Sequence, residues 1–205
     1  MKISITKLEI VRKNPKAFVA AIKAGENSQS FGVRAKYIRL QDTINYFHKI
    51  NDYNKTINYF NNSFSQYVDN SKNRKDHERY FNCFNDYVSE FKKKKYEFLT
   101  KENLKIILNE KVTVIGQIPL IFKNKKDGYS IYFFAKTNEE WETELKFPII
   151  QNYFSNYFET ELENIEVGIF SIEKNKFYQT TFLEKGIAKA EKELKAIGKT
   201  IFDIL

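Results

Sequence analysis

The sequence predicts a mixed α/β protein in which a large helical portion precedes a central mixed sheet flanked by helices. Through residues 1–98, Tyr, Phe, Ile and Val recur at three- and four-residue spacings, the period of an amphipathic helix. Through residues 99–205, short β-branched and aromatic runs alternate with helical patterns, which is typical of α/β proteins. We therefore expect a single domain over residues 1–205, with a helical portion at 1–98 and a sheet-bearing core at 99–205.

Helices are expected first along the chain. The first follows Ser4 or Thr6, either of which could be its N-cap, and it stops at Asn14-Pro15. A short second helix begins at Pro15 and ends at Gly25. Longer helical patterns cover residues 33–50, 55–69 and 75–95.

The second half of the chain changes period. The runs KIILN, VTVIGQIPLIF and YSIYFFAK predict strands, and the last two are joined by a turn at Asp127-Gly128. An acidic stretch, NEEWETELK, comes next. The remaining elements are a helix over 148–158, strands in IEVGIFSI and KFYQTTFL, and a final helix over 184–204.

Composition excludes several classes of protein. With 42% hydrophobic and 16% aromatic residues, the 205-residue chain has ample material for a core. Its one cysteine, Cys83, cannot form an internal disulfide or a thiolate zinc site, which excludes disulfide-rich secreted folds and zinc fingers. No signal-peptide pattern opens the sequence, and no apolar run approaches the roughly 20 residues that cross a bilayer. We expect a cytoplasmic protein that does not contact a membrane.

Positive charge is concentrated near the N-terminus. Residues 1–40 carry nine basic and two acidic side chains, a balance of +7, in a chain whose net charge is +8. Such a region suits a phosphate backbone, because each Lys or Arg near a phosphate releases condensed counterions. A solvated basic surface is the alternative interpretation.

Three local patterns carry a resemblance. ISITKLEIVRKNPKAF has a Ser-led helix, an Asn-Pro and a short second helix; VTVIGQIPLIF, a turn and YSIYFFAKT form a hairpin; and FPIIQNYFSNYF forms a later helix containing Gln151. Together they resemble the RecB-like branch of the PD-(D/E)XK nuclease superfamily, which includes AddB-type nuclease domains and CRISPR-associated adaptation nucleases. Gly116, Ile118, Lys136 and Thr137 agree with the family's core hairpin. The resemblance implies a restriction-endonuclease-like core.

The catalytic acidic residues of that family are missing. Active members hold magnesium with two acids at the hairpin, since this cation requires hard oxygen ligands. Aligned on Gly116 and Lys136, the two acid positions fall on Pro119 and Phe134, neither of which can ligate a cation. The family's helical His falls near Lys36. The resemblance therefore implies an inactive site that retains Lys136, has no assigned catalytic residue, and holds no metal or other cofactor.

The leading hypothesis is a catalytically inactive nuclease-fold protein that acts as a nucleic-acid-binding or scaffolding subunit. The resemblance places it in DNA recombination, CRISPR or phage-conflict machinery, with DNA preferred to RNA and with a possible protein partner. The residues expected to contact nucleic acid are Lys7, Arg12, Lys13, Lys16, Lys23, Arg34, Lys36, Arg39, Lys136 and Gln151.

Two other functions stay open. One is an active nuclease that depends on Mg²⁺ or Mn²⁺ and uses relocated acids, drawn from Glu139, Glu140, Glu142, Glu144 and Glu166. The other is a protein-interaction module that uses the aromatic helices and the acidic region 139–166 and binds no nucleic acid. The helical tyrosines near the Lys92–Lys95 run could also stack unpaired bases, although core packing explains them more economically.

Overall fold

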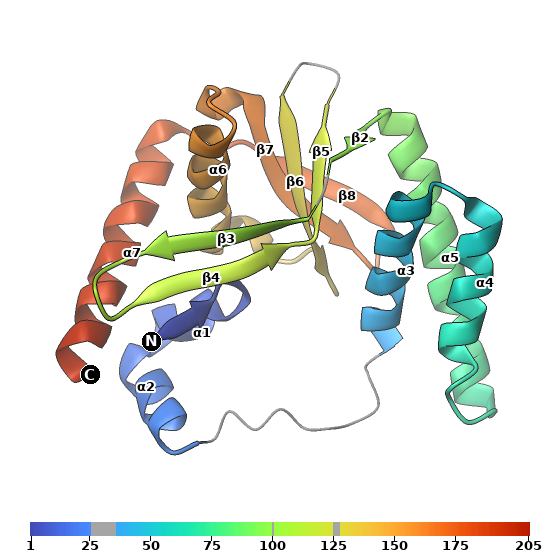
Figure 1. Ribbon diagram of the computed structural model, residues 1–205, viewed down its shortest axis with the longest axis horizontal. Helices are drawn as coiled ribbons and strands as arrows, with labels where there is room; N and C mark the ends of the chain where they lie inside the picture. The colour runs from blue at the N-terminus through green and yellow to red at the C-terminus, as the bar shows by residue number, and fades with distance from the viewer. Residues whose placement is uncertain (26–35, 100, 125–127) are drawn as a thin grey trace.

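The computed structural model describes residues 1–25, 36–99, 101–124 and 128–205 (Figure 1). Arg34 and the turn residue Asp127 lie outside the described residues. The helices are η1 (Ile5–Lys7), α1 (Leu8–Lys13), α2 (Pro15–Lys23), α3 (Lys36–Ile50), α4 (Tyr53–Phe64), α5 (Ser71–Lys94), η2 (Trp141–Thr143), α6 (Lys146–Tyr157), η3 (Leu162–Asn164) and α7 (Glu184–Ile204). The strands are β1 (Lys2–Ser4), β2 (Glu97–Phe98), β3 (Glu102–Ile107), β4 (Thr113–Ile118), β5 (Leu120–Lys123), β6 (Tyr129–Ala135), β7 (Ile165–Ser171) and β8 (Lys176–Thr180).

The described strands form two mixed sheets. The larger has the order β2-β5-β6-β7-β8, in which β6 and β7 are parallel and the other pairs are antiparallel. Helix α6 lies in the connection between β6 and β7, because two parallel strands need a crossover connection, which is usually helical. The smaller sheet has the order β1-β4-β3. The predicted α/β class, with mixed sheets flanked by helices, is confirmed.

The run VTVIGQIPLIF is two strands rather than one. Strand β4 ends at Ile118 in the smaller sheet, and β5 begins at Leu120 in the larger. Pro119 lies between them and has no backbone N–H to continue a ladder. Pro119, which the resemblance places at the first acid position, thus marks the point where the chain passes from one sheet to the other.

The expectation that residues 1–98 are helical throughout is wrong at both ends. Residues 2–4 form β1, parallel to β4, and residues 97–98 form β2, antiparallel to β5. Strands this short leave no measurable period in a sequence. Gly116 makes room for the first segment, because a Cβ there would lie 2.3 Å from Cγ2 of Ile5. Helices α1 and α2 consequently pack beside α7 and away from α3–α5 (Figure 1).

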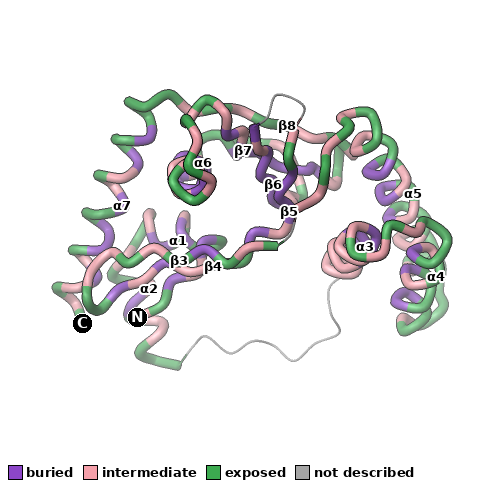
Figure 2. The backbone as a smooth tube through the Cα atoms, turned by 45° about the horizontal axis from the view of Figure 1, so that its top comes forward, coloured by how far each residue is buried: buried purple, intermediate pink, exposed green. Residues whose placement is uncertain are grey.

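The larger sheet carries a hydrophobic core on each face. Ile131 and Phe133 of β6 join the core formed with α6 and α7, whereas Tyr132 joins the core formed with α3, α4 and α5. Side chains alternate between the faces of a strand, so Phe134, two residues after Tyr132, packs against the second core. Figure 2 shows that the buried residues follow β5, β6 and β7 and the inward sides of the helices.

Side-chain caps explain where several helices begin. Asn14, Asp52 and Asn70 each accept a hydrogen bond from the backbone N–H three residues later, at the starts of α2, α4 and α5. Helix α5 ends at Lys94, and the next residue, Lys95, caps it with a left-handed φ of 53°. The expected final helix over 184–204 is confirmed. Within the described ranges, no helix is both long and apolar enough to cross a bilayer.

Candidate functional site

A cavity of about 860 Å³ lies at the C-terminal end of β6, bordered by α3, α5 and the turn between β7 and β8. We call it the Lys136 cavity. Lys36 of α3, Arg79 of α5 and Lys136 contribute three cations to its lining. Lys136 follows β6 two residues after Phe134, and both side chains line the cavity. The structure therefore brings together two of the predicted phosphate contacts, Lys36 and Lys136, from distant parts of the chain.

The three cations differ in how far they are neutralised. The Lys36 ammonium lies 2.6 Å from a carboxylate oxygen of Asp76, and this hydrogen bond lowers the pKa of Asp76. The Arg79 guanidinium lies 4.5 Å above the Tyr80 ring and 3.5 Å from Asp76. In the part of the chain that the structure describes, no carboxylate forms an ion pair with Lys136. The positive charge of Lys136 is therefore the least neutralised of the three and the most available to a ligand.

Aromatic side chains make up much of the remaining lining. Tyr37 is 46% exposed, Tyr80 is buried, and Phe134 is half-buried with its ring edge-on to Phe170. Phe134 is also the residue that the resemblance aligns with the second acid of the nuclease motif. At that expected position the structure has a hydrocarbon ring, which cannot ligate a metal.

The described lining contains one carboxylate, that of Glu173. Its backbone N–H donates to the carbonyl oxygen of Lys136 at 3.1 Å, and its carboxylate pairs with Lys174 at 2.9 Å. Among the described residues, no group of three His, Cys, Asp or Glu side chains is placed to hold a metal. One carboxylate next to aromatic rings does not provide the oxygen-rich octahedron that magnesium requires.

The proposed relocated acids are not gathered at the cavity. Glu166 lies opposite Ser130 in the β6–β7 ladder and accepts hydrogen bonds from Ser130 at 2.8 Å and from Gln179 at 3.1 Å. Ser130 is near the start of β6, so Glu166 is roughly 20 Å from Lys136 at the strand spacing of about 3.3 Å per residue. Glu144 forms an ion pair with Lys146 at 2.5 Å.

The predicted basic residues of the N-terminal region that the structure describes lie on two separate parts of the protein, one beside α7 and one on α3. Lys7, Arg12, Lys13, Lys16 and Lys23 belong to η1, α1 and α2, beside α7 and on the opposite side of the molecule from α3 (Figure 1). The run of positive charge in the sequence thus does not form one surface, because the described helices carrying it pack on different faces of the sheet.

Like Lys36, the predicted contacts Arg12, Lys23 and Arg39 are engaged within the protein. Arg12 forms an ion pair with Glu193, and the Lys23 ammonium donates to the carbonyl of Ile204. Arg39 donates to Gln66, and its Nε is buried without a hydrogen-bond partner among the described residues. Lys13 and Lys16 are exposed.

Gln151 is wrongly predicted as a nucleic-acid contact. Its side chain is fully buried, and it donates to the carbonyls of Leu162 and Phe182 and accepts from the backbone N–H of Phe182. Its role is to join α6 to two connecting segments. A polar residue on a helix gives no sign in the sequence of whether it faces solvent or backbone.

Most helical tyrosines pack into the protein. Tyr46 and Tyr59 stack on each other with centroids 4.5 Å apart, and Tyr87 is fully buried. His48 also packs inside: its Nε2 lies 2.5 Å from the Tyr87 hydroxyl, and burial lowers its pKa to about 3. Cys83 is buried as well, which raises its pKa to about 12. Among the tyrosines considered from the sequence, Tyr80 lines the Lys136 cavity.

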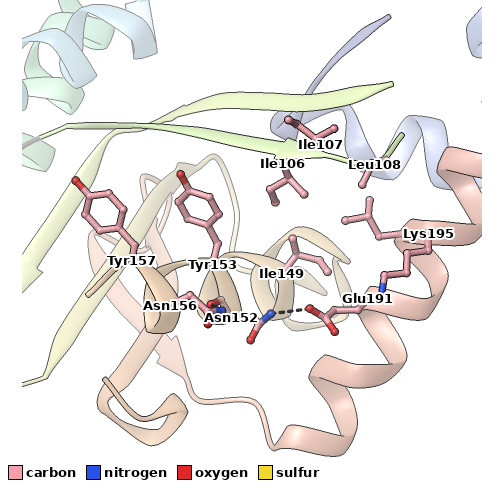
Figure 3. Close-up of a pocket in the computed structure, with 11 residues that line it drawn as sticks. Ile106, Ile107, Leu108, Ile149, Asn152, Tyr153, Asn156, Tyr157, Glu191 and Lys195 are labelled. Atoms are coloured by element: carbon pink, nitrogen blue, oxygen red, sulfur yellow. Dashed lines mark hydrogen bonds between the residues drawn. The ribbon is translucent and has the colours of Figure 1, made fainter. Parts of the chain in front are cut away.

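A second cavity of about 440 Å³ lies between β3, α6 and α7 (Figure 3). Its walls are largely aliphatic and tyrosine side chains, such as Ile106, Tyr153 and Tyr157, and its Glu191 accepts a hydrogen bond from Asn152 at 2.6 Å. None of the residues expected to contact nucleic acid lines it. The Lys136 cavity is therefore the stronger candidate.

Sequence reasoning missed five polar or aromatic residues that line the Lys136 cavity: Tyr37, Gln41, Arg79, Glu173 and Asn175. Tyr37 and Gln41 lie near Lys36 on one helix, a spacing that could have drawn attention to them. Nothing in the sequence connects α5 or the β7–β8 turn with Lys136. No protein-family model matches the chain, and no curated protein matches it in sequence.

Proposed function

We propose that this is a catalytically inactive nuclease-fold protein that binds nucleic acid through the Lys136 cavity, as a subunit of DNA recombination, CRISPR or phage-conflict machinery. The observation that carries the proposal is that Lys36, Arg79 and Lys136 line one cavity together with Phe134, the residue that the resemblance aligns with an acid position. DNA is the preferred partner, as the resemblance implies.

The arrangement of strands supports a restriction-endonuclease-like core. Strands β4 and β5 lead into β6, helix α6 crosses over, and β7 returns parallel to β6. This is the order of hairpin, helix and later strands on which the resemblance was based. Lys136 lies at the end of the hairpin's second strand, where the family's lysine would be.

The cavity is suited to binding phosphates without cleaving them. Lysine contacts a phosphate as a point charge, and arginine presents a planar fork of donors. Cleavage by this family requires a metal that polarises the phosphate and activates water, and that metal requires carboxylate ligands. With Pro119 and Phe134 at the acid positions, binding without cleavage is the expected outcome.

The experiment measures affinity for labelled DNA and RNA by fluorescence anisotropy, with Mg²⁺, Mn²⁺ or chelator, and follows cleavage on gels. Lys136→Ala and Arg79→Ala are compared with Lys105→Ala, which removes an exposed lysine from β3 in the other sheet. We expect each cavity variant to weaken binding similarly for all sequences and to lower the salt slope by about one. Chelator should have no effect.

Three results would contradict the proposal. Metal-dependent cleavage that Lys136→Ala abolishes would indicate an active nuclease with acids brought from elsewhere. An affinity that stays flat between about 50 and 200 mM salt would exclude phosphate contacts as its source. Absence of binding to any nucleic acid would instead favour the protein-interaction module.

A further inference from the structure

We propose that the Lys136 cavity accepts an unstacked base of single-stranded nucleic acid, with the flanking phosphates on Lys136 and Arg79. This inference rests on the proposed function and goes beyond it, since nucleic-acid binding alone does not require a base to enter the protein. It concerns described residues of α3, α5, the end of β6 with Lys136 after it, and the β7–β8 turn.

The first argument is the aromatic lining. Tyr37 is a large ring left 46% exposed, and the half-buried Phe134 belongs to the lining of the same cavity. A groove that held phosphates alone would need only cations. Sites for single strands combine cations with aromatic rings on which bases stack, and the Lys136 cavity has both.

The second argument is size and polarity. A volume of about 860 Å³ lies in the range of sites that enclose small molecules, about 300–1,000 Å³. Gln41 adds an amide group, which offers both donors and an acceptor to the edge of a base. The amide nitrogen of Asn175 donates to Asp86 at 2.8 Å, and its Oδ1 is buried without a hydrogen-bond partner among the described residues. A phosphate ion can accept hydrogen bonds from amide N–H groups, but it makes no use of the aromatic rings.

The third argument concerns which nucleic acid can reach the cavity. Bases in a duplex are stacked and paired, so one enters a concave site only after it has been flipped out, at a cost in stacking and pairing. A single strand pays much less of that cost. The cation–π pair formed by Arg79 above the Tyr80 ring lies in the same lining, so a phosphate on Arg79 would be close to a base inside the cavity.

The test compares a single strand with a blunt duplex of equal length, and uses a strand carrying 2-aminopurine, whose fluorescence reports stacking. We expect the single strand to bind more tightly than the duplex, with a change in 2-aminopurine fluorescence on binding. Tyr37→Ala and Phe134→Leu should weaken single-strand binding by about 5- to 150-fold for the loss of a stacked base. They should diminish the fluorescence change and leave duplex affinity nearly unaltered.

Two variants serve as controls. Tyr37→Phe keeps the ring and should restore both affinity and fluorescence. Tyr53→Ala removes a tyrosine of similar exposure, 40%, from α4 and outside the lining, and should behave like the parent protein. Because the Tyr37 side chain is exposed, its truncation should leave the fold intact, which circular dichroism checks.

The outcomes separate the two proposals. Equal affinity for single strand and duplex, with no fluorescence change and no effect of Tyr37→Ala, overturns the base-binding inference while phosphate binding by Lys136 and Arg79 stands. Failure to bind any nucleic acid overturns both.

Discussion

Arg12 of α1 and Glu193 of α7 form a two-point ion pair, with Nε 2.6 Å from Oε1 and Nη2 3.1 Å from Oε2. The same guanidinium donates to the carbonyl of Thr143 at 3.0 Å. The hydrogen bond to Glu193 is the largest cause that raises the pKa of Arg12. Arg12 therefore joins the two ends of the chain to η2, rather than presenting a free cation to a phosphate.

Arg12→Ala should lower the free energy of unfolding by about 1 kcal/mol, because bidentate ion pairs are among the stronger ones but both side chains here are about a third exposed. Lys13→Ala removes the same charge from an exposed neighbour and should change stability by less than about 0.5 kcal/mol. Urea denaturation measures both. If Arg12→Ala lowered nucleic-acid affinity far more than Lys13→Ala did, the structural role assigned to Arg12 would be incomplete.

Gly168→Ala should destabilise the protein by roughly 2 kcal/mol or more, the scale of overpacking in a rigid interior. A Cβ on this residue of β7 would lie 2.0 Å from the carbonyl oxygen of Tyr178, a backbone atom of the paired strand β8. Gly186→Ala is the matched control: in α7 nothing lies within 4 Å of the added Cβ, and higher helix propensity should stabilise by up to about 1 kcal/mol. Thermal melts of the two variants should shift in opposite directions.

Gln151→Leu should cost about 3 kcal/mol, since it leaves the carbonyls of Leu162 and Phe182 and the N–H of Phe182 without their partner. Gln117→Leu makes the same change at an exposed position of β4 and should be nearly neutral. Chemical denaturation distinguishes them. A Gln151→Leu protein of unchanged stability that had lost nucleic-acid binding would restore the binding role.

His48 should make stability depend on pH. Burial lowers its pKa to about 3, from an ordinary value of 6.5, so the unfolded chain binds the proton more readily than the folded protein does between these values. The contribution is fully present above about pH 6.5 and is lost as the pH falls, at up to about 1.4 kcal/mol per pH unit.

The measurement compares urea midpoints of the parent protein and of His48→Phe from pH 7 to pH 4. The phenylalanine keeps a ring against Phe98, on which His48 stacks at 4.4 Å. The stability difference between the two proteins should change steadily in favour of the variant as the pH falls. A constant difference would show that His48 ionises alike in the folded and unfolded states.

The sequence predicts the parts of this fold that depend on neighbouring residues, and it misses the parts that depend on distant ones. The stripe of Ile187, Leu194 and Ile201 places α7 correctly, since helical periodicity is written in residues a few positions apart. Strand β1 is missed because Lys2–Ser4 forms only where β4 offers a partner far along the chain. The sequence predicts one continuous strand through Pro119, because the pattern of apolar residues does not show that β4 and β5 belong to different sheets.

The sequence by itself determines the α/β class, the presence of a lysine at position 136 and the absence of carboxylates at positions 119 and 134, because these depend on residue identity and short-range periodicity. Only the tertiary structure decides which cations act together. It separates Arg12 from Lys36 by packing α1 and α3 on opposite faces of the sheet, and it brings Arg79 to Lys136. Charge along a chain is a local property, whereas the cavity exists because two faces of one sheet must each be covered by helices.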